Sequence, residues 1–291
     1  MKKLASKITA VLVAAGLMFS AGTIGNIDFG LTAFAEENTA EGYTNGFCDK
    51  YELKADGSWG LIDDDANCTH TNCNGYQPAT KNTQDCYEIG NAGQLYWFAD
   101  KVNNDKEHYG SAKAVLTANI TVNSGLEGKN GLLDSLEYNE TGEVTNGENI
   151  TSWTPIGNSN NQYTGTFDGQ GHTISGLYFI NTSTEYVGLF GMVESGGSVS
   201  NVGVEDSYFK GKDYVGGVCG LNYCGTITNC YNTGNVSGSG RVGGVCGKNA
   251  AAADAHVTTI TNVTATITNC YNTGAVSGTN DYVAILKVDT R

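Results

Sequence analysis

Proline and charged residues are scarce in this chain of 291 residues. It contains 2 prolines, and 16% of its residues are Asp, Glu, Lys or Arg. Its 40 glycines indicate that the backbone needs many tight turns but few rigid ones. Solubility must therefore rest largely on Asn, Thr, Ser and Gly. This composition favours a β-solenoid over a helical bundle or a disordered linker.

Motifs of several common active sites are also absent. The sequence has no His-Glu-x-x-His zinc helix and no Gly-x-x-x-x-Gly-Lys phosphate loop. Its histidines are too scattered to indicate a Ser-His-Asp arrangement: His70, His108, His172 and His256. The repeats described below contain few Asp or Glu, and none recurs in phase to form the carboxylate pair that glycoside hydrolysis needs. We therefore predict no catalytic residue and no cofactor.

The net charge of −14 argues against nucleic-acid binding, because an acidic protein repels phosphate backbones. The N-terminus resembles a secretory signal peptide, with a basic start, an apolar run over Ile8 to Phe19 and a small-x-small site at Ala33-Phe34-Ala35. We predict cleavage of residues 1–35 and a secreted or cell-surface protein that does not insert into the membrane. A retained N-terminal anchor is the alternative, although the apolar run is short for a membrane span.

Internal repetition dominates the C-terminal half. An apolar-x-x-apolar element starts at Ile174, Val199, Ile227 and Ile267, in steps of 25, 28 and 40 residues. A second element keeps the same phase, as Val187-Gly-Leu-Phe-Gly and then twice as Val-Gly-Gly-Val-Cys-Gly from Val215 and Val242. An Ala-rich insertion, roughly Ala250 to Thr264, lengthens the last step. Periods in the twenties with short β-type segments predict stacked coils.

The repeats predict an all-β fold, a right-handed single-stranded parallel β-helix. Each coil would turn small apolar side chains inward, as at Val215, Val218, Ile227 and Val236, and would pair its backbone with the coils above and below. Asn229 and Asn269 occupy equivalent positions, as do Asn232 and Asn272. These asparagines are expected either to form hydrogen-bonded ladders between coils or to serve only as turn-favouring residues.

Upstream of the repeats the pattern is helical over about residues 91–103. Leu95, Phe98, Ala99 and Val102 lie on one face, and a strand over Ala114 to Val122 follows. Since a β-solenoid needs a terminal cap, we expect the helix to cover its first coil. The domains predicted are a signal peptide at 1–35, an irregular Cys-containing segment at 36–86 and the β-helix at 87–291, with repeats over about 174–281.

Nine cysteines fall into two groups. Cys48, Cys68, Cys73 and Cys86 lie in the N-terminal segment and could be joined by disulfides, bind zinc or remain free thiols. In the repeats, Cys219 shares a position with Cys246, and Cys230 with Cys270, while Cys224 has no counterpart. We expect these repeat cysteines to be small apolar residues of the interior.

The repeats resemble those of GLUG-motif proteins, which are bacterial surface and secreted proteins. The resemblance rests on Trp153-Thr-Pro-Ile-Gly157, on Tyr163-Thr-Gly-Thr-Phe-Asp-Gly-Gln-Gly-His-Thr-Ile174 and on the Val-Gly-Gly-Val-Cys-Gly repeats, and it covers about residues 86–281. It implies scaffold or binding modules rather than catalytic centres. The last repeat departs from the pattern, since Ala284-Ile-Leu-Lys-Val288 replaces the expected glycine-rich element. This departure suggests a fragment or a C-terminus elsewhere.

The function predicted is a non-enzymatic surface module that binds glycans or host proteins, or a structural scaffold. Repeat-edge tyrosines are the binding candidates, with stacking between coils as the alternative: Tyr208, Tyr214, Tyr231 and Tyr271. A carbohydrate-active β-helix enzyme and a passive spacer remain alternatives. Asp168 and His172 belong to an Asp-Gly-x-Gly segment interpreted as a turn, and the cations a lyase would need are isolated: Lys210, Lys212 and Arg241.

Overall fold

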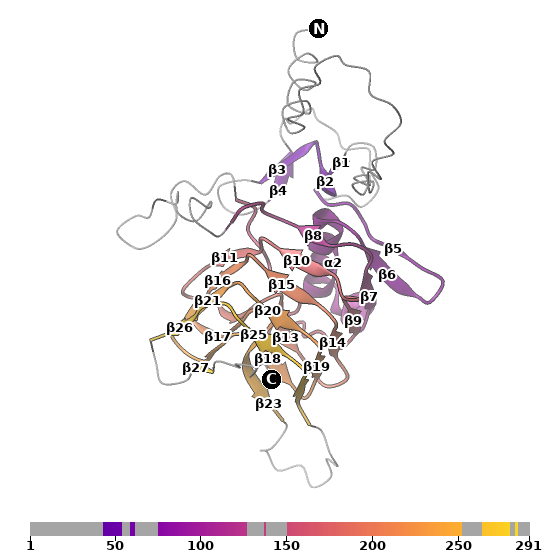
Figure 1. Ribbon diagram of the computed structural model, residues 1–291. Helices are drawn as coiled ribbons and strands as arrows, with labels where there is room; N and C mark the ends of the chain where they lie inside the picture. The colour runs from indigo at the N-terminus through magenta and orange to yellow at the C-terminus, as the bar shows by residue number, and fades with distance from the viewer. Residues whose placement is uncertain are drawn as a thin grey trace, which may run out of the picture. The chain divides into compact units, whose positions relative to one another are not determined.

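Short β-strands, most of them paired in parallel, are the main regular structure of the described chain (Figure 1). The computed structural model describes residues 43–53, 59–61, 75–126, 137, 150–251, 264–279 and 283–284. The predicted signal peptide, Cys68, Cys73 and most of the Ala-rich insertion lie outside these residues. The chain divides into Met1–Glu36 and Glu37–Arg291, and everything described below belongs to the second unit.

Every fifth strand of the repeat region returns to the same sheet, and we call five successive strands a layer. Layer 1 contains β9 (Thr166–Asp168), β10 (Thr173–Ser175), β11 (Tyr178–Ile180), β12 (Glu185–Val187) and β13 (Phe190–Val193). Layer 2 contains β14 (Ser198–Ser200), β15 (Gly203–Glu205), β16 (Tyr208–Lys210), β17 (Asp213–Gly216) and β18 (Cys219–Tyr223). Layer 3 contains β19 (Thr226–Thr228), β20 (Tyr231–Asn232), β21 (Asn235–Gly238), β22 (Val242–Gly243) and β23 (Cys246–Ala250). Layer 4 contains β24 (Thr266–Thr268), β25 (Tyr271–Asn272), β26 (Val276–Gly278) and β27 (Val283–Ala284).

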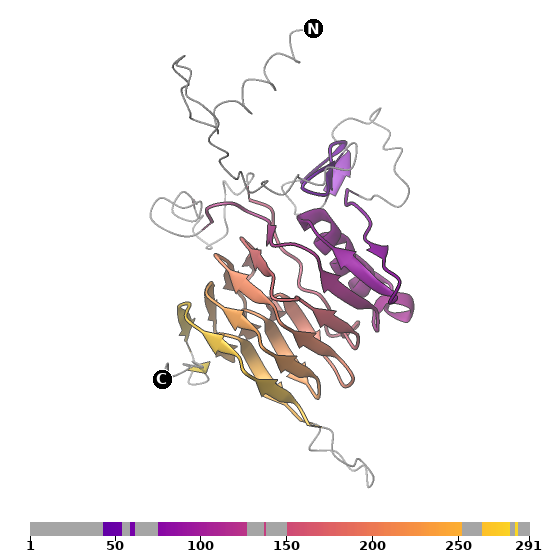
Figure 2. The same ribbon diagram turned by 45° about the vertical axis from the view of Figure 1, so that its right-hand side comes forward.

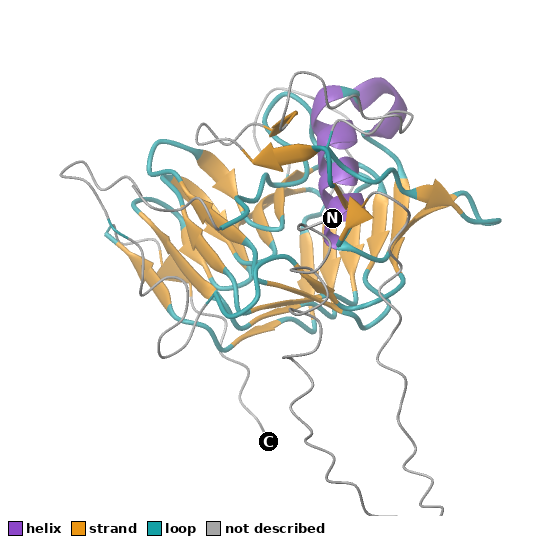
Figure 3. Cartoon of the chain, turned by 90° about the horizontal axis from the view of Figure 1, so that it is seen from above, coloured by secondary structure: helices purple, strands orange, loops and turns teal. Residues whose placement is uncertain are grey.

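Corresponding strands of successive layers lie side by side and pair in parallel (Figure 2). The resulting sheets lie on different sides of the stack, as the view from above shows (Figure 3). An earlier, partial layer precedes layer 1. It consists of β7 (Lys113–Leu116), β8 (Ile120–Thr121) and isolated parallel bridges from Ser152, Ile156 and Tyr163 to layer 1. The predicted strand over Ala114 to Val122 is thus two strands.

The register confirms most of the predicted repeats. Ile227 pairs with Val199 on one side and with Ile267 on the other, and Val215 pairs with both Val187 and Val242. Val283 pairs with Val242, so the repeat resumes after the insertion.

The first predicted step, from Ile174 to Val199, is wrong. Val199 pairs with Phe167, whereas Ile174 pairs with Val204 in the neighbouring sheet. Between these two strands layer 1 has four residues, Gly169 to His172, and layer 2 has two, Asn201 and Val202. The first and second strands of each layer both carry an inward apolar residue. The spacing from Ile174 to Val199 therefore resembles a repeat, although the two residues belong to different strand positions.

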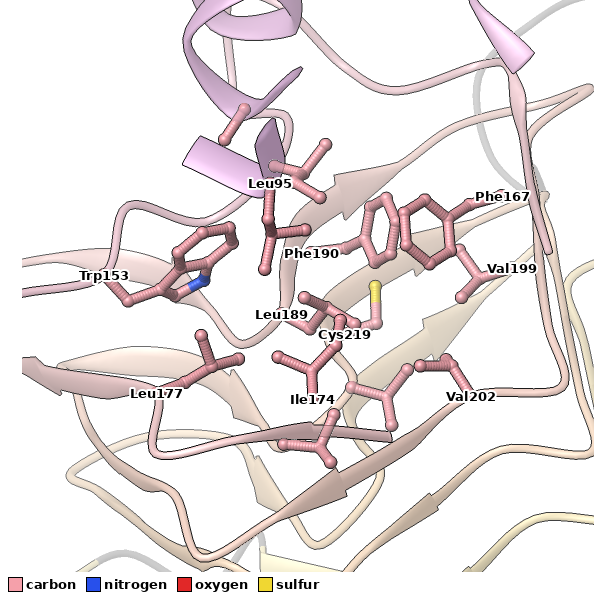
Figure 4. Packing of buried hydrophobic residues seen from close by; sticks show 14 of the residues in the cluster. Leu95, Trp153, Phe167, Ile174, Leu177, Leu189, Phe190, Val199, Val202 and Cys219 are labelled. Atoms are coloured by element: carbon pink, nitrogen blue, oxygen red, sulfur yellow. The ribbon is translucent and has the colours of Figure 1, made fainter. Parts of the chain in front are cut away.

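One continuous apolar core fills the interior of the layers. Val215, Val218, Ile227 and Val236 are all buried, as predicted, together with Cys219. The aromatic part of the core lies nearest the helix, where Phe167 and Phe190 meet edge to face with ring centroids 5.2 Å apart. Figure 4 shows Leu95 of the helix close to Trp153 and Phe190, with the smaller aliphatic residues beyond them.

Helix α2 (Ala92–Asn104) covers this aromatic end, and it matches the predicted capping helix. The helix starts where Asn91 accepts a hydrogen bond from the Gln94 amide, and its four predicted core residues are buried. A one-turn helix, α3 (Lys106–Tyr109), follows it. Upstream, β5 (Thr80–Lys81) and β6 (Cys86–Ile89) extend the seven-stranded sheet, so this sheet begins before the predicted domain boundary at residue 87.

The N-terminal segment contributes two short antiparallel pairs. They are β1 (Tyr43–Thr44) with β2 (Phe47–Cys48), and β3 (Tyr51–Leu53) with β4 (Trp59–Leu61). The segment contacts the helix start closely, since a Cβ on Gly93 would lie 1.7 Å from the Gly46 carbonyl oxygen. Across the described residues, no helix is long and apolar enough to span a membrane.

Two asparagine columns run through the layers. At the corner after the first strand, the amides of Asn201, Asn229 and Asn269 form a ladder, with Nδ2–Oδ1 distances of 2.9 and 3.2 Å. These three residues also have φ of 53°, 54° and 52°, a left-handed conformation that Asn tolerates well. These asparagines therefore form a hydrogen-bonded ladder and also serve as turn residues.

The second column is buried. Asn232 is fully buried, and its Nδ2 donates to Asn272 Oδ1 at 2.8 Å. The glycine before Val218 leaves space for it, because a Cβ on Gly217 would lie 2.2 Å from Asn232 Cγ. Gly244 has the same relation to Asn272. Each second glycine of the Val-Gly-Gly element thus accommodates a polar side chain from the next layer.

We predict that Ile227→Ala lowers the free energy of unfolding by about 2–5 kcal/mol, because it removes a buried side chain between Val199 and Ile267. Urea denaturation of residues 36–291 measures the change. Thr228→Ala, on the opposite face of the same strand, should change the free energy by under about 0.5 kcal/mol. Equal losses in the two variants would contradict the inward orientation of Ile227.

We predict that Asn232→Ala costs about 1–3 kcal/mol, because it leaves the Gly234 amide and the Asn272 Oδ1 without their buried partner. Asn229→Gly is the matched control, since it deletes an exposed amide at a left-handed position without straining the backbone. Thermal unfolding compares the two variants, and a larger destabilisation by Asn229→Gly would contradict the prediction.

Candidate binding surface

Two of the four candidate tyrosines stack on each other. Tyr231 and Tyr271 pair across layers 3 and 4, with ring centroids 4.9 Å apart and planes within 5° of parallel. The Tyr231 ring lies against Gly203 of layer 2, where a Cβ would approach its Cζ to 2.3 Å. Tyr271 remains 38% exposed. Stacking between layers therefore occurs, and it leaves one ring accessible.

Glu205 fixes the inner member of this stack. The Tyr231 hydroxyl donates a hydrogen bond of 2.5 Å to Glu205 Oε1. Partial burial, and then this carboxylate, raise the pKa of Tyr231 above its usual value. The ring is thus held in one orientation by a stack on one side and an anion at its edge.

A second tyrosine stack, in the sheet of β12 and β17, pairs Tyr214 with Tyr186. Their centroids are 4.9 Å apart and their planes 11° from parallel. Both have positive φ, 54° and 64°, so two bulky residues adopt a left-handed backbone at equivalent positions of β12 and β17. Tyr186 was not among the sequence candidates, although its place before Val187 matches that of Tyr214 before Val215.

Cations gather around Tyr214. The Arg241 guanidinium carbon lies 4.5 Å from the centre of the Tyr214 ring, and Lys248 Nζ lies 5.9 Å from it. Arg241 also forms an ion pair with Asp213, and Lys212 binds Glu185 at 2.8 Å. Lys212 and Arg241 are therefore not isolated as the sequence suggested. Layer stacking brings together, in these two ion pairs, charges that are 27 and 28 positions apart in the sequence.

Tyr208 lies in a different environment. It pairs in register with Tyr178 and packs against a small cluster formed by Leu126, Ile150 and Tyr178. Its ring thus covers apolar side chains of the segment that precedes layer 1. Among the four candidates, Tyr208 contributes to packing between the repeats and this segment.

Asp168 and His172 are turn residues, as the sequence indicated. Asp168 Oδ1 accepts hydrogen bonds from the Gln170 amide and from Asn201 Nδ2, both at 2.9 Å. His172 Nδ1 lies 3.1 Å from Asn119 Oδ1. Each side chain thus secures the corner of layer 1, and Asp168 starts the exposed asparagine column.

Four of the five repeat cysteines are buried, as the sequence predicted, and Cys246 is the exception. Cys219, Cys230 and Cys270 are buried in the core and Cys246 is half-buried, all as free thiols. The Cys230 amide donates to Cys270 Sγ at 3.4 Å. Cys48 is buried and Cys86 half-buried, while Cys68 and Cys73 lie outside the described residues. In the described part of the chain no three His, Cys, Asp or Glu side chains gather as a metal site would require.

The chain carries a GLUG motif at residues 213–237, which confirms the resemblance seen in the repeats. These residues run from β17 of layer 2 to β21 of layer 3, so the motif corresponds to one full circuit of five strands. The structure therefore explains the length of the motif as the smallest unit that can be stacked.

Two curated proteins share part of the chain. Halomucin of Haloquadratum walsbyi is 38% identical over 90 residues, which are 30% of this chain and 1% of halomucin. A protein named as a Gly-rich membrane protein of Evansella cellulosilytica is 35% identical over 80 residues, 26% of this chain and 9% of that protein. The chain thus spans a small fraction of the length of these relatives.

Among solved structures, a protein of Bacteroides ovatus is similar, with a TM-score of 0.43 and 21% sequence identity. That protein is named provisionally as an immunoglobulin A1 protease. The similarity covers 66% of this chain and 48% of that one.

We predict that the raised pKa of Tyr231 makes stability fall at high pH. The unfolded phenol ionises near pH 10 and the folded one only above that, so its contribution is complete below pH 10 and is lost as the pH rises further. Urea unfolding at pH 8 and pH 10.5 measures the loss. Tyr231→Phe should lose less stability than the parent between these pH values, and equal losses would contradict the prediction.

Proposed function

We propose that this chain is an extracellular, non-enzymatic module, a single right-handed parallel β-helix that binds glycans or surface proteins. The observation that supports binding most directly is the pair of tyrosine stacks on the outer faces of layers 1 to 4. Aromatic rings offer a large contact area at a low cost in side-chain entropy, and they carry a hydroxyl for hydrogen bonds. Within each stack, two rings separated by the layer spacing suit a ligand with repeated units.

The rigidity of the stacks supports the same proposal. Tyr231 is held by Glu205, and Tyr214 lies between Tyr186 and the Arg241 guanidinium. Because these rings are already ordered, a ligand that binds to them loses little further side-chain entropy. The charged groups beside Tyr214 add polar contacts at the edge of the aromatic surface.

Right-handedness and location rest on separate arguments. Parallel strands joined by crossover connections are almost always right-handed, because strand twist favours that hand. An extracellular location is supported by the signal-peptide pattern at the N-terminus and by the relative named as a membrane protein. The chain matches only a small part of each relative, as expected for a repeat module that occurs within larger surface proteins.

We predict that the secreted chain binds to members of a glycan array or to host-matrix proteins, and that Tyr271→Ala weakens binding about 3- to 10-fold by removing an exposed ring. Tyr271→Phe, which keeps the ring, should retain most of the affinity. Surface plasmon resonance measures both variants. Failure of the parent chain to bind any member of either panel would contradict the proposed function.

A further inference from the structure

A pocket of about 340 Å³ lies beside helix α2, away from the tyrosine stacks. It is lined mainly by two aromatic rings and by short polar side chains: Tyr76, Tyr96, Asp100, Asn104, Thr154 and Asn158. Its volume is at the lower end of the range for small-ligand sites, enough for one or two sugar rings. Sequence reasoning missed the pocket, because its residues come from three separate segments.

A cluster of three aromatic rings forms one wall. The rings of Tyr76 and Tyr96 have centroids 5.8 Å apart with their planes tilted by 40°, and Phe47 meets both of them edge to face. Tyr96 is fixed further by an edge-to-face contact with Trp153 and by its hydroxyl, which donates to the Ser152 carbonyl at 2.8 Å. The wall is therefore rigid and apolar on its face.

A carboxylate stands beside this wall. Asp100 Oδ1 accepts a hydrogen bond from Asn104 Nδ2 at 2.7 Å. Its Oδ2 lies 4.0 Å from Lys101 Nζ, too far for a hydrogen bond. Burial, and then the charge of Asp100, raise the pKa of the Tyr76 hydroxyl, so this phenol stays neutral next to the anion. The pocket thus combines a neutral aromatic surface with one strong hydrogen-bond acceptor.

The opposite wall is locked to the helix by Asn103. Its Oδ1 accepts from the Gly157 amide at 2.8 Å, and its Nδ2 donates to the Pro155 carbonyl at 3.0 Å. Gly157 has φ of 76°, and a Cβ there would lie 2.7 Å from the Met192 carbonyl oxygen. The 154–158 loop, which brings Thr154 and Asn158 to the pocket, is therefore held in one position.

We propose that this pocket binds one uncharged, hydroxyl-rich sugar unit, stacked on Tyr76 and hydrogen-bonded through its hydroxyls to Asp100. This inference rests on the proposed glycan binding but assigns it a second site. A carboxylate accepts hydrogen bonds from hydroxyls strongly, and it repels uronate or sulfate groups, as does the net charge of −14. Asn104, Thr154 and Asn158 add uncharged polar groups that suit a neutral ring.

The test uses the full secreted chain and a panel of neutral gluco-, galacto- and manno-configured oligosaccharides, with uronate oligosaccharides as the counter-panel. Isothermal titration calorimetry should detect binding of at least one neutral member. Asp100→Asn should weaken it about tenfold or more, since a hydrogen bond to a charged group is replaced by one to an amide. Glu107→Gln, on the neighbouring helix and outside the pocket, should leave the affinity unchanged while removing the same charge.

Two further variants separate this site from the tyrosine stacks. Tyr76→Phe should retain binding and Tyr76→Ala should lose it, with circular dichroism confirming that each variant is folded. Neutral glycan binding that survives Asp100→Asn but is lost in Tyr271→Ala would overturn the pocket while sustaining the proposed function. Absence of neutral binding, or binding of uronate oligosaccharides by the parent chain as tightly as neutral ones, would also overturn it.

Discussion

The fold depends on backbone hydrogen bonds between equivalent strands of successive layers. Strands of two to five residues cannot bury a face alone, so each gains stability only when the next layer pairs with it in register. A slip of one residue would turn Ile227 outward and bring Thr226 or Thr228 into the core. The pairing of Val283 with Val242 shows that the register is recovered even after a long insertion.

The buried asparagines couple sequence motifs that lie apart along the chain. Asn232 and Asn272 occupy the column that holds Ile174 and Val204 in earlier layers. Where asparagine replaces the aliphatic residue, the preceding layer carries the additional glycine, Gly217 or Gly244, that leaves room for the amide. The Val-Gly-Gly-Val-Cys-Gly and Tyr-Asn-Thr-Gly segments are therefore two halves of one packing arrangement.

Periodicity could predict the helix from the spacing of its apolar residues. It could also predict the stacked strands, their core positions and the equivalent asparagines and cysteines, because these recur from layer to layer. The start of the array was misplaced at Ile174, since the corner of layer 1 is two residues longer than that of layer 2. The cations around Tyr214 and the pocket beside Asp100 could not be predicted, because residues distant in sequence meet there only after folding. The sequence identified the tyrosines as candidates, but it could not predict which residues they stack against.

The Asn249 side chain has a consequence for protein engineering. Its Nδ2 donates to the Ala265 carbonyl at 3.1 Å, which ties together the two ends of the insertion between β23 and β24. The strand before the insertion, β23, pairs with layer 2, and the strand after it, β24, pairs with layer 3. This junction is therefore a natural place to graft a foreign peptide for display, with the clamp keeping the graft from disturbing the register.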